Sequence, residues 1–342
     1  MKTIIKPFMM LLFIVTLFSC SNDDNSNVIQ NPINRDIYTC GTETNGTYNI
    51  AKVWKNGIGI DLTDGTRNTI ARSVFVSGND VYVAGYEENS LSRIAKFWKN
   101  GVVTNLSDGS EFAYAYSITV SGSDVYVAGF ESNGTVNVAK IWKNGTAINI
   151  TDGTKSAIAS CVLVNGSDVY VGGYETIGTK KVAKIWKNGA AINLSDGSYD
   201  NSVSSIAISG TDIYACGYAF NGTKFVAKVW KNGIGTILTD GLNTSYGNSI
   251  AVSNNDVYVT GYESNGTKNV AKIWKNGITT NLTDGLNNAY ASSIFISQTD
   301  IYVGGSEFNG TKNAAKFWKN STATAIEESI LNDQQVYSIF IK

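Results

Sequence analysis

The chain has 342 residues, of which 43% are apolar and 16% are charged, and its formal net charge is −1. This balance provides no basic surface stripe of the kind that nucleic-acid-binding proteins carry, so we expect no nucleic-acid partner. Histidine is absent, which removes the commonest general base, the usual zinc ligand and every Ser–His or Cys–His nucleophile pair.

Residues 1–19 have the form of a bacterial signal peptide. Two early lysines give a positive start, and the apolar run over residues 8–18 is too short to span a bilayer. The tetrad Leu-Phe-Ser-Cys that ends at Cys20 resembles the bacterial lipobox, in which the cysteine is lipidated and becomes the mature N-terminus. An ordinary signal peptide cleaved near the same place is the alternative.

Residues 20–35 are predicted to be the lipidated cysteine and a flexible tether. The stretch Ser-Asn-Asp-Asp-Asn-Ser-Asn after Cys20 is polar and acidic and has nothing to bury. Acidic residues close behind the cysteine resemble the surface-export signal of Bacteroidota lipoproteins, and Ser21 fits sorting to the outer membrane. The resemblance implies an outer-membrane lipoprotein at the cell surface, held in the lipid bilayer through acylated Cys20.

Residues 36–342 contain seven copies of one unit. The 7 tryptophans, from Trp54 to Trp318, follow one another at intervals of 44 residues. In every unit an aspartate stands 18 residues before the tryptophan, a tyrosine follows two residues later, and a glycine three residues after that. Self-similarity at this period indicates a solenoid, a propeller or an array.

Local signals choose among these architectures. Each unit holds four runs of β-branched or aromatic residues separated by turn residues, and no helical periodicity follows the leader. Asn265-Gly266 and Asn276-Gly277 stand in the second and third connections of one unit and favour two-residue type I′ hairpins. Four antiparallel strands per unit predict an all-β fold, a seven-bladed β-propeller with one blade per unit.

The two ends of the repeat region are predicted to complete one blade. The first unit lacks its opening strand, and the chain ends on Val336-Tyr-Ser-Ile-Phe-Ile, a copy of strand one. The C-terminal strand should therefore pair with the strand that begins at Asp36 and close the first blade, which removes an open sheet edge.

The run Asp80-Val-Tyr-Val-Ala-Gly-Tyr-Glu, with Ala-Lys-Ile-Trp in later units, resembles the bacterial seven-bladed propeller repeat and, more loosely, kelch blades. The resemblance covers nearly all of residues 36–342. It implies the fold and almost nothing about chemistry, because propellers host many unrelated functions.

Positions that are alike in every unit are interpreted as scaffold. We expect the tryptophans to pack between blades rather than to stack on sugars. The lysine after each tryptophan is predicted to stand across the ladder from an aspartate, as in Lys275 opposite Asp256. The lysine two residues before each tryptophan, such as Lys52, is expected to extend past the indole or to pair with a neighbouring blade.

Two further residue types are also interpreted as structural. The Asp-Gly pairs that follow the fourth strand predict Asx-type turns rather than calcium ligands. Three cysteines replace small residues of other units and are expected to be buried free thiols: Cys40, Cys161 and Cys216.

Positions that differ between units are candidates for ligand binding, because seven variable loops should ring one mouth of the central channel. One position near the channel carries Arg72, Tyr116, Asn248 and Tyr337, and serine in the other units: Ser160, Ser204 and Ser292. The surrounding candidate residues are Arg67, Glu111, Phe112, Tyr114, Tyr199, Asp200, Tyr246 and Tyr290. A ring of glutamates on the hairpins between strands two and three, broken by Ala219, is expected on the same face.

Together these features predict a monomeric binding module with no metal or other cofactor. Aromatic rings mixed with Glu, Asn and Arg suit sugars, so glycan is the favoured ligand of the loop face. A protein-interaction scaffold is the alternative. An enzyme is least favoured and no catalytic residue is assigned, because Glu111 and Asp200 lie two blades apart, whereas a glycosidase needs two carboxyl groups about 5–9.5 Å apart.

Overall fold

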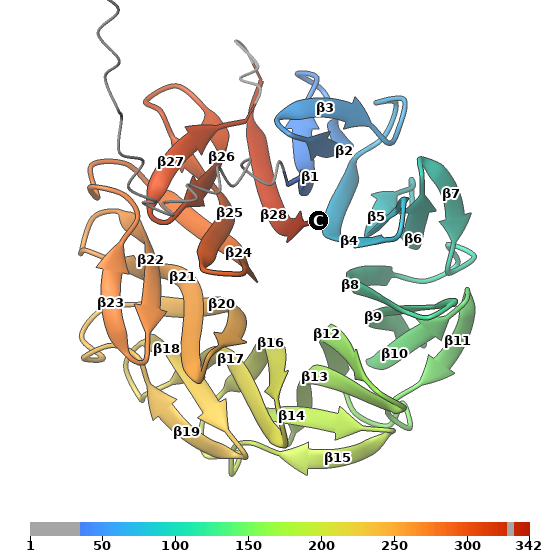
Figure 1. The fold of residues 1–342 in the computed structure, drawn as a ribbon. Coiled ribbons are helices and arrows are strands. Elements are labelled where there is room, and N and C mark those ends of the chain that lie inside the picture. The colour runs from blue at the N-terminus through green and yellow to red at the C-terminus, as the bar shows by residue number, and fades with distance from the viewer. Residues whose placement is uncertain (1–34, 327–331) are drawn as a thin grey trace, which may run out of the picture. The chain divides into compact units, whose positions relative to one another are not determined.

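The structure is a computed structural model that describes residues 35–326 and 332–342. Cys20, the signal peptide and the tether up to residue 34 lie outside the described residues. The described residues form seven four-stranded antiparallel sheets arranged in a ring around a central opening (Figure 1). The predicted seven-bladed β-propeller is therefore confirmed. Within the described ranges, no helix has the length and apolar character needed to cross a membrane.

The strands take four positions in the blades, from the channel outward. The innermost strands of blades I–VII are β28 (Gln334–Ile341), β4 (Thr69–Ser77), β8 (Ala113–Ser121), β12 (Ala157–Asn165), β16 (Asn201–Ser209), β20 (Ser245–Ser253) and β24 (Ala289–Ser297). The second strands are β1 (Ile37–Thr44), β5 (Asp80–Glu88), β9 (Asp124–Ser132), β13 (Asp168–Ile177), β17 (Asp212–Phe220), β21 (Asp256–Ser264) and β25 (Asp300–Phe308). The third strands are β2 (Asn49–Lys55), β6 (Arg93–Lys99), β10 (Asn137–Lys143), β14 (Lys180–Lys187), β18 (Phe225–Lys231), β22 (Asn269–Lys275) and β26 (Asn313–Lys319). The outermost strands are β3 (Ile58–Asp61), β7 (Val102–Asn105), β11 (Thr146–Asn149), β15 (Ala190–Asn193), β19 (Ile234–Ile237), β23 (Ile278–Asn281) and β27 (Thr322–Ala325).

Blade I is closed by the two ends of the repeat region. Its strand order is β28-β1-β2-β3, and β28 runs antiparallel to β1 from the Ile37–Ile341 pair to the Glu43–Gln334 pair. The backbone N–H of Lys342 donates to the carbonyl of Asp36 at 2.9 Å. The C-terminal strand thus fills the edge that the first unit leaves open, as predicted.

The third connection of each blade is a tight turn. Lys275 pairs with Ile278 across the β22–β23 hairpin, which leaves Asn276 and Gly277 as a two-residue loop. Their φ angles are 49° and 82°. Positive φ at both positions defines the type I′ turn, so the Asn-Gly prediction is confirmed here.

The second connection is longer than predicted. Ser264 pairs with Asn269, so the loop has four residues rather than two. The side chain of Asn265 organises it, because its Oδ1 accepts hydrogen bonds from the backbone N–H groups of Thr267 and Lys268 at 3.1 and 2.9 Å. The two-residue turn predicted at Asn265-Gly266 is therefore wrong.

The longer loop shifts the register by two residues. Tyr258, and not Asp256, lies opposite Lys275. The expected ion pair still forms on the diagonal, with Lys275 Nζ 2.7 Å from Asp256 Oδ2, and Asn276 donates to the other carboxylate oxygen at 2.7 Å. The direct cross-strand pairing was wrong, but the two charged residues do meet.

Each innermost strand contains a β-bulge at the same place. In β4, Ala71 pairs with Gly85 and Ser73 with Ala84, so Arg72 is the extra residue. The bulge brings the carbonyl oxygen of Ile70 to 1.9 Å from where a Cβ of Gly85 would lie. Only glycine fits there, which accounts for the glycine that every unit carries, and the bulge re-aims its extra residue. The extra residues of the seven blades are Arg72, Tyr116, Ser160, Ser204, Asn248, Ser292 and Tyr337.

The tryptophans pack between blades, as expected. Trp186 is 2% exposed and belongs to a cluster that joins Val162 and Val171 of its own blade to Tyr126 and Ile141 of blade III. The other six are no more than 1% exposed. Indole rings in these seams leave no face for a sugar.

Serine hydroxyls connect the innermost strands of neighbouring blades. The backbone N–H of Ile118 donates to Ser73 Oγ, and that of Val74 to Ser338 Oγ, each at 3.2 Å. Cys161 occupies the corresponding place in blade IV, where burial raises the pKa of its thiol to about 12. All three cysteines of the described residues are free and buried, as expected.

Candidate functional site

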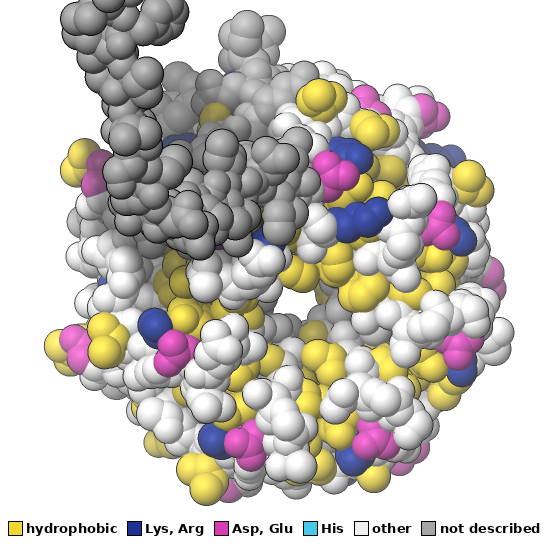
Figure 2. Space-filling model, in the orientation of Figure 1, with side chains coloured by type: hydrophobic (Ala, Val, Ile, Leu, Met, Phe, Trp, Pro, Cys, Tyr) yellow, Lys and Arg dark blue, Asp and Glu magenta, His cyan; other side chains and the backbone are white. Residues whose placement is uncertain are grey.

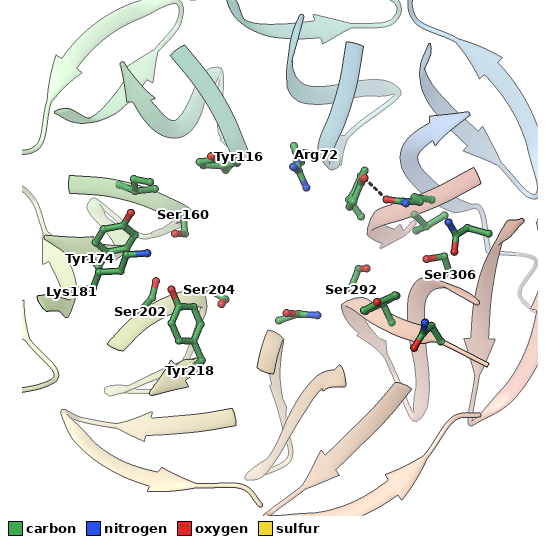
Figure 3. Close-up of a pocket in the computed structure, with 18 of the residues that line it drawn as sticks. Arg72, Tyr116, Ser160, Tyr174, Lys181, Ser202, Ser204, Tyr218, Ser292 and Ser306 are labelled. Atoms are coloured by element: carbon green, nitrogen blue, oxygen red, sulfur yellow. Dashed lines mark hydrogen bonds between the residues drawn. The ribbon is translucent and has the colours of Figure 1, made fainter. Parts of the chain in front are cut away.

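The central channel holds a cavity of about 850 Å³, and all seven extra residues of the bulges line it. Figure 3 shows Arg72, Tyr116, Ser160, Ser204 and Ser292 around the open space. The space-filling view shows much hydrophobic surface around the opening, with the acidic side chains that are visible in this view farther out (Figure 2). The bulge thus delivers one side chain per blade to a common space.

Arg72 is the charged group of this ring. Its Cζ lies 4.5 Å from the ring centroid of Tyr337 and 5.8 Å from that of Tyr86, with Nη2 3.4 Å from the Tyr86 hydroxyl. Its Nε is buried without a hydrogen-bond partner, and no carboxylate of the described residues forms an ion pair with it. Aromatic faces stabilise the cation, while part of its hydrogen-bonding capacity stays unused.

The cavity is positive overall. Lys181 also lines it, with Nζ 4.7 Å from the ring centroid of Tyr174, and no aspartate or glutamate of the described residues is among the lining side chains. Burial raises the pKa of the Tyr116 and Tyr337 hydroxyls, so both stay neutral at physiological pH. The site therefore offers two cations, neutral phenols and aromatic faces.

Five of the twelve candidate residues meet at this cavity: Arg72, Tyr116, Asn248, Tyr290 and Tyr337. Tyr114 lies outside, stacked at 4.8 Å on Phe130, and Arg93 donates to its hydroxyl. Phe112 packs against the same arginine at 5.7 Å. Tyr246 stacks on Tyr262 at 5.3 Å. These aromatic side chains pack against other side chains within and between blades and do not line the channel cavity.

The charged loop candidates also lie outside the channel cavity. Arg67 Nη1 is 3.3 Å from Glu87 Oε1. Asp200 accepts the backbone N–H of Lys181 at 2.8 Å and so fixes the loop before blade V. Glu111 lines neither the channel cavity nor a second cavity, whereas Tyr199 lines the second one. The structure therefore does not bring Glu111 and Asp200 together at the channel.

Sequence reasoning missed a second row of cavity residues. Tyr174 and Tyr218 line the channel from the second strands and are shown in Figure 3. They follow the glycine that faces the bulge, at a position that varies between units: Thr42, Tyr86, Phe130, Tyr174, Tyr218, Tyr262 and Ser306. The variation between units that singled out Arg72 would also have singled out these two tyrosines, but this position was not among the candidates.

The predicted glutamates stand near the ends of the second strands, and each is held in an ion pair. Each pairs with the lysine two residues before the tryptophan of its own blade, as in Lys184–Glu175 at 2.5 Å and Lys272–Glu263 at 2.6 Å. The expected pairing of that lysine with a neighbouring blade is therefore wrong, because the partner comes from the adjacent strand of the same sheet.

The Asp-Gly pairs form the predicted Asx turns. Asp64 Oδ1 accepts hydrogen bonds from the backbone N–H and the hydroxyl of Thr66 at 3.0 and 2.8 Å. In the part of the chain that the structure describes, no group of three or more Cys, Asp or Glu side chains could hold a metal ion.

The comparison with known proteins adds no functional assignment. Neither a protein-family model nor a curated protein matches the chain in sequence. What the structure shows is the fold: the described chain is a seven-bladed β-propeller.

Proposed function

We propose that this protein is an outer-membrane lipoprotein at the cell surface that binds glycan at the mouth of its central channel. The observation that carries the proposal is Arg72. It stands between aromatic rings without a carboxylate partner, in a cavity of about 850 Å³ lined by a further lysine and no acid. A cation with free donors beside tyrosine faces suits a sugar ring that carries an acidic group.

Differences among the seven blades support an asymmetric site. Blades I, II and III contribute Tyr337, Arg72 and Tyr116 to the bulge position, while blades IV and V contribute Ser160 and Ser204. Blades that only have to pack need no such differences. The lipobox-like tetrad at Cys20 and the acidic tether support the location, on the resemblance to Bacteroidota surface lipoproteins.

The channel site is tested by binding of the detergent-solubilised full chain to a glycan array. Arg72→Ala and Tyr116→Ala should each abolish binding of the glycans that the wild type retains, because each removes a group that faces the ligand. Ser204→Ala, at the matching position across the ring, is the control and should bind as wild type. Equal effects in all three variants, with melting temperatures within a few degrees of wild type, would argue for a symmetric or outer-rim site and contradict the asymmetric channel site.

The anchor is tested separately by Cys20→Ala. Without the sulfur that carries the acyl chains, the protein should leave the membrane fraction or accumulate as unprocessed precursor, because a single polar tether has no membrane affinity of its own. Fractionation followed by mass measurement of the N-terminus distinguishes these outcomes. A variant that is processed and still bound to the outer membrane contradicts the lipoprotein proposal.

A further inference from the structure

Blade V breaks the Lys–Glu pairing that the other six blades share. Its lysine is Lys228, and the glutamate position is Ala219. The residue of β19 that pairs with this lysine is Ile237. Blade I has Asp61 at the same position, 3.2 Å from Lys52. Blade V has therefore lost the carboxylate and gained no polar replacement from β19.

Among the described residues Lys228 is in no ion pair, and the carboxylate of Asp196 acts on it only at longer range. Its Nζ lies 5.2 Å from the ring centroid of Trp230, and its Cε passes 2.4 Å from where a Cβ of Gly235 would lie. The side chain thus passes over a glycine of β19. Burial lowers the pKa of Lys228, and Asp196 opposes this only in part.

A second unsatisfied group stands beside the missing carboxylate. Asn201 lies directly opposite Ala219 in the β16–β17 ladder and is 5% exposed. Its Nδ2 donates to the carbonyl of Tyr199 at 2.9 Å, whereas its Oδ1 is buried without a partner. Blade I carries Gln334 here, which donates to its Glu43. The other five blades carry small residues: Thr69, Ala113, Ala157, Ser245 and Ala289.

Lys228 and Asn201 both line a cavity of about 410 Å³. This seam cavity lies between blade V and the loop that joins blades IV and V, and one wall is formed by Ser195, Asp196, Ser198 and Tyr199 of that loop. Tyr199 is 47% exposed, and its ring centroid lies 6.1 Å from that of Phe220. One wall is therefore aromatic. The lining also holds a cation without an ion pair, Lys228, an acceptor without a partner, Asn201 Oδ1, and one carboxylate, Asp196, which accepts hydrogen bonds from Ser198.

We propose that this seam cavity binds a uronic acid residue, a sugar that carries a carboxylate. The carboxylate takes the place of the missing glutamate and pairs with Lys228. A sugar hydroxyl donates to Asn201 Oδ1, and a face of the ring packs on Tyr199. The site is distinct from the channel cavity, whose lining residues differ, and it does not depend on the channel binding a glycan.

The test compares D-glucuronate with D-glucose, which lacks the carboxylate, by isothermal titration calorimetry on the detergent-solubilised full chain. An Arg72→Ala background removes the cation on which the channel proposal rests, so a failure of one proposal leaves the other measurable. Glucuronate should bind and glucose should bind about tenfold more weakly or not at all, because a hydrogen-bonded charge pair is lost. Equal binding of the two sugars, or no binding of glucuronate at millimolar concentration, overturns the proposal.

The decisive variant restores the arrangement of the other blades. Asn201→Ala with Ala219→Glu copies the Ala157–Glu175 pair of blade IV and should supply Lys228 with an internal carboxylate. Glucuronate binding should then be lost while the melting temperature holds or rises. Unchanged binding in this variant overturns the proposal.

Matched lysine variants separate binding from stability. Lys228→Met should abolish glucuronate binding with little change in melting temperature, because this lysine has no ion pair to lose. Lys272→Met, at the same position of blade VI, should leave binding intact and lower the melting temperature, because it removes the ion-pair partner of Glu263. Loss of binding in both variants would show that the effect is not specific to the seam cavity.

Discussion

Removal of residues 334–342 should unfold the propeller or leave a protein that aggregates at physiological temperature. This deletion takes away the whole of β28, including Val336, Ile339 and Ile341, which are 1%, 3% and 4% exposed. Burial of each such side chain contributes about 1.5–3 kcal/mol, so the loss approaches the total stability of about 5–15 kcal/mol that is typical of a folded domain. It also bares the edge of β1 to pairing with other chains. Thermal denaturation followed by circular dichroism measures the effect.

A circular permutant is the matched control, because it keeps β28 and changes how β28 is connected to the rest of the propeller. Lys342 and Asp36 exchange backbone hydrogen bonds, and the β4–β5 hairpin joins the equivalent pair, Ser77 and Asp80, with two residues. A Gly-Asn link from Lys342 to Asp36, with new ends between residues 331 and 332, should therefore melt at or above the wild-type temperature. If the truncated chain melts together with the wild type, the closure of blade I contributes nothing to stability.

Trp186→Ala should lower the free energy of unfolding by about 3–5 kcal/mol, the usual cost of emptying a large aromatic site. Trp186 fills the seam between blades III and IV, against Ile141 on one side and Val162 on the other. Strands in a rigid ring cannot collapse fully into the space that the indole leaves. Urea denaturation followed by circular dichroism gives the difference.

Ile192→Ala is the control for this variant, since Ile192 is an apolar residue of the same blade that is 42% exposed. It should change the free energy of unfolding by no more than about 0.5 kcal/mol. A Trp186→Ala protein that keeps its full stability and loses only glycan binding would assign the tryptophans to ligand contact and contradict the packing role.

The channel site divides into a part that variation between units could reveal and a part that it could not. Variation between units revealed Arg72, Tyr116 and Tyr337. These large side chains occupy a strand position that is serine in three other units. The bulge that turns these residues toward the channel leaves no signal of its own except the glycine opposite, whose role emerged from the close approach of the Ile70 carbonyl. Tyr174 and Tyr218 were overlooked because the search for variable positions was confined to the loops and the start of the first strand.

The ion pairs were the least predictable feature, because they depend on register. A hairpin loop of four residues rather than two moves every cross-strand partner by two positions. The error placed Lys275 opposite Asp256 and left the lysine before each tryptophan without a partner. With the true register, Lys272 meets Glu263, and the absence of that partner in blade V becomes visible.

The sequence by itself determined the number of blades, their four strands, the closure of blade I and the packing role of the tryptophans. These features are periodic or local: a 44-residue repeat, β-branched runs, Asn-Gly turns and a final copy of strand one. Only the tertiary structure decided which side chains share a cavity and which carboxylate each lysine meets. It also decided that Lys228, without an ion pair, and Asn201 Oδ1, without a hydrogen-bond donor, line the same cavity. The physical reason is that such contacts form across strands and seams, where loop length and bulges set the alignment of residues far apart in the chain.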